Sequence, residues 1–124
     1  MDRLVQRSED FIKALNSLKE GLEQEESDIV IDGILHRFEF TFELSWKLLK
    51  DHLEYSGIVE NIGSPREIIK AAFKHGLIEN ADVWIDMMLS RNLLSHLYDE
   101  DNSRKIYLKI KDVYVKELEV LVNL

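Results

Sequence analysis

The sequence predicts an all-α fold, a four- to five-helix up-and-down bundle that forms a single domain over residues 1–124. Three observations predict this fold. Apolar residues recur at three- and four-residue intervals along most of the chain, which is the spacing of one helix face. The chain has only five Gly and one Pro, too few for a sheet with many tight turns. Its 124 residues, 45% of them hydrophobic, suit one folded core.

The first helix is indicated by an apolar stripe near the amino terminus: Leu4, Phe11, Leu15, Leu18 and Leu22. An acidic stretch, Glu20–Asp32, follows it and carries six carboxylates with no Lys or Arg. We interpret this stretch as a solvated helix end and turn, with Asp28 favouring the start of the next helix.

The second helix competes with a strand in the sequence, because Phe38–Leu44 alternates apolar and polar residues. A longer three-and-four stripe runs past both ends of that alternation: Ile31, Leu35, Phe38, Phe42, Trp46, Leu49 and Leu53. Glu43 and Lys47 add a helical (i, i+4) pair. We therefore expect a helix of about 25 residues, which is about 37 Å long at 1.5 Å per residue.

Start and stop signals define the remaining helices. Ser64–Glu67 forms a capping box with Pro65 at the first helical position, and that helix ends at His75–Gly76. A fourth helix begins at Asn80 or Ala81 and runs to about Leu97. After the polar break Asp99–Ser103, we expect Ser103 to cap a last helix. Its apolar positions are Ile106, Ile110, Val113, Leu118 and Leu121.

The fourth helix is apolar almost all the way round. Its apolar residues are Trp84, Ile85, Met87, Met88, Leu89, Leu93, Leu94 and Leu97. A helix of this kind is buried on more than one side, whereas a monomeric bundle normally leaves one face of each helix in water. We therefore expect a homodimer with this helix at or near its two-fold axis.

Polar residues nevertheless interrupt this helix: Arg91, Asn92, Ser95, His96 and Tyr98. One interpretation is that they pair with acidic residues of neighbouring helices and fix the packing. The other is chemical, because Arg can hold a phosphate and His can transfer a proton near neutral pH. Five residues apart on a straight helix, Arg91 and His96 point about 140° away from each other. They could then meet one phosphate only if the helix unwinds near Ser95 or if two copies share a cleft.

These residues resemble a known family. Arg91–His96 matches the Arg-x4-His motif of the HEPN superfamily of nucleotide-binding helical domains, and its continuation to Tyr98 resembles HepT-type toxins. Other segments are similar to the nucleotidyltransferase substrate-binding proteins: Gly33–Lys47, Ser64–Glu67, Gly76–Ile78 and Trp84–Tyr98. The match covers nearly the whole chain and is far more specific than Arg-x4-His alone.

The resemblance implies a helical homodimer that pairs with a separate minimal nucleotidyltransferase. For the toxins it implies metal-independent endoribonuclease activity at the dimer cleft, where RNA or a nucleotide binds. Arg91 would stabilise the scissile phosphate, and His96 would act as general acid or base with the RNA 2′-OH as nucleophile. Asn92 and Ser95 would be supporting polar residues. Tyr98 corresponds to the tyrosine that the partner adenylylates to silence the toxin.

Two alternatives remain open. The older family name implies a non-catalytic subunit that binds a nucleotide or substrate for the nucleotidyltransferase, and an unrelated structural bundle would require an accidental match. The chain is not itself a nucleotidyltransferase, because Gly63-Ser64 and Asp99-x-Asp101 are too far apart to form that enzyme's signature. We expect no cofactor, since no glycine-rich phosphate loop follows a strand.

We also expect no metal site. The four His residues are scattered, and Glu39 and Glu43, one turn apart, have no Glu-x-x-His partner and read as an exposed face. Without Cys there is no disulfide or thiolate site. No apolar run is long enough to cross a membrane and no signal peptide is visible, so we expect a cytoplasmic protein.

Charge limits the RNA contact that the motif implies. The formal charge of −8 opposes broad binding to nucleic acid. The segment Asn102–Leu124 is nonetheless net +2, with five basic against three acidic residues. Its basic residues, either an RNA track or a solvated helix face, are Arg104, Lys105, Lys109, Lys111 and Lys116.

Overall fold

The computed structural model describes residues 2–58, 63–96 and 100–124, the side chains of residues 2, 96 and 100 excepted. All secondary structure in these ranges is helical, which confirms the all-α prediction. The α-helices are α1 (Asp2–Leu22), α2 (Asp28–Tyr55), α3 (Pro65–Lys74), α4 (Ala81–Leu93), α5 (Glu100–Lys109) and α6 (Val115–Glu119). Shorter turns are the 3-10 turns η1 (Leu94–His96) and η3 (Val120–Asn123) and the π-turn η2 (Ile110–Tyr114).

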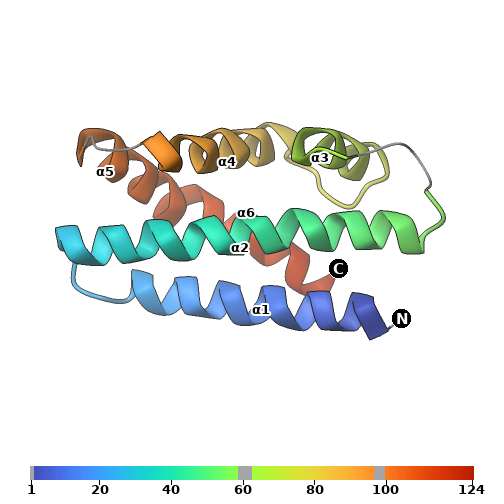
Figure 1. Ribbon diagram of the computed structural model, residues 1–124, viewed down its shortest axis with the longest axis horizontal. Coiled ribbons are helices and arrows are strands. Elements are labelled where there is room, and N and C mark those ends of the chain that lie inside the picture. The colour runs from blue at the N-terminus through green and yellow to red at the C-terminus, as the bar shows by residue number, and fades with distance from the viewer. Residues whose placement is uncertain (1, 59–62, 97–99) are drawn as a thin grey trace.

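The long helix α2 is the centre of the bundle (Figure 1). Helix α1 runs along one side of it, and α3 and α4 lie along the other. The rod formed by α5, η2, α6 and η3 crosses behind α2, so both chain termini lie at the same end of the molecule. The up-and-down arrangement expected from the sequence is confirmed.

The core settles the helix-or-strand question for Phe38–Leu44. The segment lies inside α2, and the adjacent residues Thr41 and Phe42 are both buried, at 0% and 1% exposed, whereas a strand would place neighbours on opposite faces. The Phe38 ring stacks on Tyr114 of the π-turn with 5.4 Å between centroids, and Phe42 lies 6.4 Å from Trp84 of α4. Helix α2 therefore packs against both the rod and α4 through one aromatic row.

Helices α1 and α2 approach closely, with a glycine at one contact and side-chain to main-chain hydrogen bonds at others. A Cβ on Gly21 would lie 3.1 Å from the Ile34 side chain, so only glycine fits there without a shift. Thr41 donates its hydroxyl to the Ala14 carbonyl at 3.2 Å, and Arg37 donates to the Ser17 carbonyl. These bonds fix the sliding register of α1 on α2, which the apolar contacts alone would leave looser.

The local start and stop signals occur where the sequence placed them. Ser27 accepts from the Val30 amide and begins α2. The Ser64 hydroxyl accepts from the Glu67 amide at 3.2 Å and donates to its carboxylate at 2.9 Å, with Pro65 at the first position of α3. Gly76 has a φ of +79°, the left-handed conformation that ends a helix at low cost. The capping box and the glycine stop are both confirmed.

Two predicted helix boundaries were wrong. Helix α4 ends at Leu93, not near Leu97, and continues as the 3-10 turn η1. The Ser95 hydroxyl donates to the Asn92 carbonyl at 3.1 Å, a local bond that competes with the α-helical ladder. Helix α5 begins at Glu100, so Ser103 lies inside its first turn and does not cap it.

The apolar face of the last rod also differs from the prediction at one position. Ile106, Ile110, Leu118 and Leu121 are buried as expected, but Val113 is 44% exposed and Tyr114 is buried in its place. The cause is η2, since a π-turn bonds residue i to i+5 and so holds more residues than an α-helical turn. The wider turn brings Tyr114, rather than Val113, beneath Ile110.

Candidate functional site

Arg91, the arginine of the Arg-x4-His motif, lies in the last turn of α4 and faces α2. Its guanidinium NH2 is 3.1 Å from Oε2 of Glu43. The two side chains line a hollow of about 150 Å³ whose walls are His36, Glu39, Phe40, Glu43 and Arg91. Arg91 Nε is covered and has no acceptor among the described residues. A buried donor without an acceptor is unfavourable, so the guanidinium keeps a hydrogen-bonding capacity that Glu43 does not fill.

Glu43 is itself held in place. The indole of Trp46 donates to Glu43 Oε2 at 3.2 Å, and Lys47 Nζ lies 3.9 Å from Oε1. The carboxylate therefore links Trp46 to Arg91 and orients the guanidinium toward the outer face of α2. The sequence placed Glu43 on an exposed face, but its side chain is 31% exposed and partners the motif. The packing interpretation of Arg91, a pairing with an acidic residue of a neighbouring helix, is thus part of the observed site.

The other motif residues are less involved in side-chain contacts. Asn92 and Ser95 are exposed, and Ser95 bonds only to the Asn92 carbonyl among the interactions of the described residues. The backbone of His96 belongs to η1, and its side chain is outside the described part of the structure. Tyr98 also lies outside the described residues. Of the motif residues, Arg91 is thus the one whose side chain the structure places against α2.

A second hollow of about 220 Å³ adjoins the first on the side of η1. It is lined by Asp32, Leu35, His36, Glu39, Leu94 and Ser103. His36 and Glu39 belong to both hollows, so they mark the boundary between them. No sequence pattern indicates this role for His36, because Arg91 lies far from it along the chain and only the packing of α4 on α2 brings them together.

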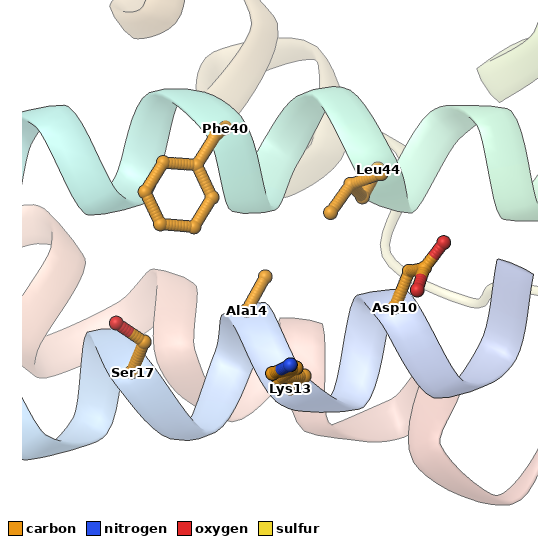
Figure 2. Close-up of a pocket in the computed structure, with 6 residues that line it drawn as sticks. All are labelled: Asp10, Lys13, Ala14, Ser17, Phe40 and Leu44. Atoms are coloured by element: carbon orange, nitrogen blue, oxygen red, sulfur yellow. The ribbon is translucent and has the colours of Figure 1, made fainter.

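A largely apolar groove lies between α1 and α2 (Figure 2). It measures about 440 Å³ and is lined by Asp10, Lys13, Ala14, Ser17, Phe40 and Leu44. Phe40 lines both the groove and the Arg91 hollow. Phe40 is therefore the residue at which the groove and the Arg91 hollow meet.

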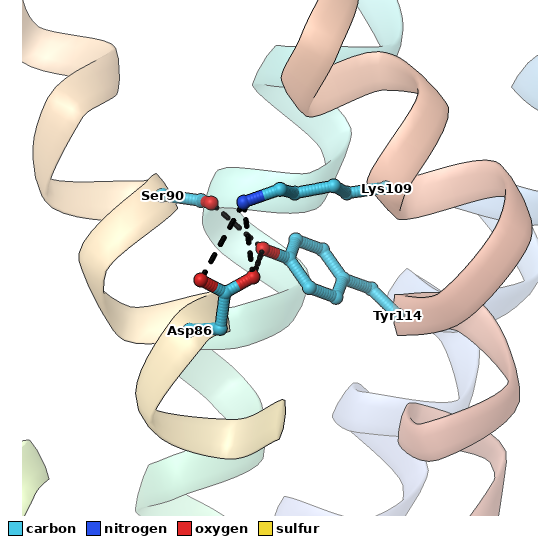
Figure 3. Close-up of polar contacts among 4 residues, drawn as sticks. All are labelled: Asp86, Ser90, Lys109 and Tyr114. Carbon is cyan, nitrogen blue, oxygen red and sulfur yellow. Dashed lines mark hydrogen bonds and ion pairs between the residues drawn. The ribbon is translucent and has the colours of Figure 1, made fainter. Parts of the chain in front are cut away.

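A polar network of Asp86, Ser90, Lys109 and Tyr114 joins α4 to the last rod (Figure 3). The Tyr114 hydroxyl contacts Ser90 at 2.8 Å and donates to Asp86, whose carboxylate also accepts from Lys109 at 3.2 Å. Burial, together with the bond to the Asp86 carboxylate, raises the pKa of Tyr114 well above its ordinary value. In an α-helix, Lys109 and Tyr114 would point about 140° apart. The π-turn lets both reach Asp86.

This network and a second ion pair engage two of the five basic residues that could form an RNA track. Lys109 is engaged by Asp86, and Arg104 pairs with Glu26 and lies 3.5 Å from Asp28. Both basic side chains therefore connect the rod to acidic residues of the same chain. Lys105, Lys111 and Lys116 are exposed on the rod.

Helix α4 also carries an apolar stripe on its outer side. Leu89 and Leu93 are 46% and 53% exposed, and Ile85, one turn earlier, is half-buried. Leu89 and Leu93 are each two residues from Arg91, which places them about 200° around the helix from it. The predicted second apolar face of α4 is therefore present, on the side opposite the Arg91 hollow.

Within residues 2–58, 63–96 and 100–124, no three His, Asp or Glu side chains are grouped so as to hold a metal ion. None of the helices described is long and apolar enough to span a membrane.

Comparisons with known proteins agree with this architecture. A Haemophilus influenzae protein named probable ribonuclease HepT is 32% identical over 100 residues, which is 78% of this chain and 68% of that protein. A crystal structure from Thermus thermophilus has a TM-score of 0.83 at 32% identity, covering 91% of this chain and 96% of its own. A Haemophilus influenzae structure, described as the fold of a substrate binding domain of a nucleotidyltransferase, has a TM-score of 0.83 at 28% identity. That similarity covers 94% of this chain and 96% of the other.

The family described as nucleotidyltransferase substrate binding protein like matches residues 6–123, nearly the whole chain. The match includes α2 with Glu43 as well as α4 with the Arg91 motif, so the resemblance read from the sequence is confirmed over both walls of the site. This chain belongs to the family of nucleotidyltransferase substrate binding protein-like proteins.

Proposed function

We propose that this chain is a metal-independent endoribonuclease of the HEPN type, the toxin of a toxin–antitoxin pair with a separate minimal nucleotidyltransferase. The observation that carries the proposal is the Arg91 guanidinium, held by Glu43 in a hollow, whose buried Nε has no acceptor among the residues that the structure describes. A guanidinium with unused donors is suited to the charge that develops on a phosphate during cleavage. The similarity to a protein named probable ribonuclease HepT supports the same reaction.

Arg91 and His96 are the proposed catalytic residues. Arg91 stabilises the non-bridging oxygens of the scissile phosphate, while His96 transfers a proton to or from the reacting oxygens. Asn92 and Ser95 support the turn that carries them, which is consistent with the bond from Ser95 to the Asn92 carbonyl. The RNA 2′-OH is the nucleophile, so the protein supplies no covalent intermediate.

The active form is proposed to be a homodimer. Two surfaces suit a second copy: the Leu89–Leu93 stripe of α4 and the groove between α1 and α2. The groove shares Phe40 with the Arg91 hollow, so a two-fold axis there would bring two copies of Arg91 near one cleft; this differs from the sequence expectation, which put the axis at or near α4. We therefore assign the dimer contact to the groove.

The nucleotidyltransferase partner would silence the toxin by adenylylating Tyr98, two residues after His96. An adenylyl group there adds bulk and a negative phosphate beside the site, and that phosphate would repel the RNA backbone. Mass spectrometry after mixing the chain with the partner and ATP tests this step. An adenylyl addition on Tyr98 supports the toxin–antitoxin scheme, and an unmodified tyrosine contradicts it.

The cleavage proposal is tested by incubating the purified protein with single-stranded RNA in EDTA. We expect cleavage by the wild type and its loss in Arg91→Ala and His96→Ala. Arg66→Ala and His75→Ala are matched controls, because both residues are exposed on or at the end of α3 and outside the site. Cleavage that persists in Arg91→Ala would exclude this site as its source.

A second function is favoured by the acidic walls of the site. Asp32, Glu39 and Glu43 line the two hollows beside Arg91, and these carboxylates oppose the approach of an RNA backbone. A non-catalytic subunit that binds a nucleotide or substrate for the nucleotidyltransferase would need no RNA track. It predicts complex formation with the nucleotidyltransferase, no cleavage of RNA in EDTA and no growth arrest when the chain is expressed alone.

A further inference from the structure

His36 lies between the two hollows of the site. It is carried by α2, its ring packs edge-on against Phe40 with 5.6 Å between centroids, and it lines both hollows together with Glu39. The first hollow contains Arg91, and the second contains Leu94 of η1. The side chain is exposed, so a ligand in either hollow can reach it.

RNA cleavage by an internal 2′-OH requires two proton transfers. One group takes the proton from the 2′-OH, and another gives a proton to the 5′-oxygen that leaves. Among the described residues that line the Arg91 hollow, the candidates for proton transfer are His36, Glu39 and Glu43, because an arginine stays protonated throughout. Glu43, the carboxylate nearest to Arg91, is already engaged by that guanidinium and by Trp46.

We propose that His36 is a second catalytic residue of the RNA cleavage proposed above, one of its two proton-transfer groups, acting on a phosphate in the hollow that it lines with Arg91. The inference rests on that proposed function. One of the two groups takes the 2′-OH proton as the 2′-oxygen bonds to phosphorus. The bond from phosphorus to the 5′-oxygen breaks, and that oxygen takes a proton from the other group. The products are a 2′,3′-cyclic phosphate and a 5′-hydroxyl end, and no oxidant or metal is consumed.

The surroundings of His36 make its contribution measurable. The charged and titratable groups that line the two hollows with it are Asp32, Glu39 and Glu43 on α2 and Arg91 on α4. Ser103 of α5 adds a neutral hydroxyl. A change in the pH–rate profile when His36 is replaced therefore reports the loss of its proton-transfer group.

The experiment makes three measurements: kcat for a single-stranded RNA oligonucleotide in EDTA, its profile across the neutral pH range, and the affinity for an uncleavable oligonucleotide. His36→Asn removes the proton-transfer group and keeps a small polar side chain, and His75→Asn is the matched control. We expect His36→Asn to lower kcat by about a hundredfold or more and to remove one limb of the profile. Its affinity for a 2′-O-methyl oligonucleotide, which cannot be cleaved, should stay within about threefold of wild type because a proton-transfer group contributes little to ground-state binding. His75→Asn should match the wild type in all three measurements.

The outcomes separate this inference from the function on which it rests. Cleavage that depends on Arg91, with the same rate and pH profile in His36→Asn as in wild type, would overturn the role of His36 alone. A loss of 2′-O-methyl oligonucleotide binding equal to the loss of kcat would make His36 a binding residue and would also overturn the proposal. If no cleavage depends on Arg91, the proposed function fails and the role of His36 fails with it.

Discussion

Oε2 of Glu43 on α2 lies 3.1 Å from the guanidinium of Arg91 on α4, and the same oxygen accepts the indole N–H of Trp46. Glu43 therefore has two opposing effects on a phosphate that approaches Arg91. It fixes the direction of the guanidinium, and it repels the phosphate charge. These effects can be separated by a substitution that keeps the shape of the side chain.

We expect Glu43→Gln to tighten RNA binding and to slow cleavage. The amide removes the repulsion, so affinity for a 2′-O-methyl oligonucleotide should rise by about threefold to tenfold. The guanidinium loses its charged anchor, so kcat should fall by about tenfold or more. Fluorescence anisotropy and single-turnover kinetics measure the two changes. Glu54→Gln is the control, because Glu54 is exposed on α2 and lines neither hollow. A fall in both affinity and kcat would contradict a competing role for Glu43.

The dimer contact can be assigned with two charge insertions. Leu44→Glu places a carboxylate in the groove between α1 and α2, and Leu93→Glu places one on the outer stripe of α4. We expect the first variant to sediment as a monomer at micromolar concentration and the second to remain a dimer, because a buried unpaired charge disrupts an interface. Ser17→Arg, also in the groove, repeats the test on α1.

Circular dichroism checks that each of these variants keeps its helices. The reverse pattern, a monomer only with Leu93→Glu, would assign the dimer to the α4 stripe and separate the two Arg91 hollows. A wild-type chain that sediments as a monomer would contradict the homodimer itself.

Tyr114→Phe should weaken the fold at neutral pH and change its alkaline behaviour. The variant loses the hydroxyl bonds to Asp86 and Ser90, at a cost of about 1–2 kcal/mol in the free energy of unfolding. In the wild type the pKa of Tyr114 is raised in the folded chain, so above pH ~10 the unfolded chain ionises first and stability falls. Urea unfolding at several pH values should show a shallower decline for Tyr114→Phe. Tyr55→Phe, at an exposed tyrosine, should leave the wild-type profile unchanged.

His52 should make the fold sensitive to mild acid. Burial lowers the pKa of His52, and the neighbouring Asp51 carboxylate only partly opposes this shift. As the pH falls below ~6.5, the unfolded chain takes up this proton before the folded chain does, so the free energy of unfolding decreases. His52→Gln should flatten that decrease in urea unfolding curves, whereas His75→Gln should not. An identical acid dependence in His52→Gln would contradict the role of this side chain.

The parts of the fold that depend on local sequence could be predicted from it. Ser64 and Glu67 specify the start of α3 within four residues, and Gly76 specifies its end. The boundary of α4 could not, because Ser95 bonds to a main-chain carbonyl in competition with the helix. The exposure of Val113 could not either, since no residue type signals the extra residue of a π-turn.

The site was predictable only as far as its motif. Arg91 was identified from its position before His96, but its partner Glu43 is on another helix. Nothing along the chain distinguishes Glu43 from the exposed Glu39 one turn away. His36 likewise gains a chemical role only from the packing of α4 against α2, which no periodicity encodes. Local patterns therefore identified one wall of the hollow, and the tertiary contact supplied the other.

The π-turn Ile110–Tyr114 has a consequence for how the chain tolerates changes in length. It is equivalent to one inserted residue in an otherwise α-helical rod, so every side chain after it is rotated by about 100° relative to an uninterrupted helix. Glu117, which accepts from the Trp84 indole at 3.2 Å, faces α4 only because of that rotation. Deleting one residue from this turn would restore an uninterrupted α-helix and keep Glu117, Leu118 and Leu121 on their present faces, whereas deleting Val115 or Lys116 would turn all three together to a different face. The end of the rod is therefore specified by a count of residues as well as by their identity.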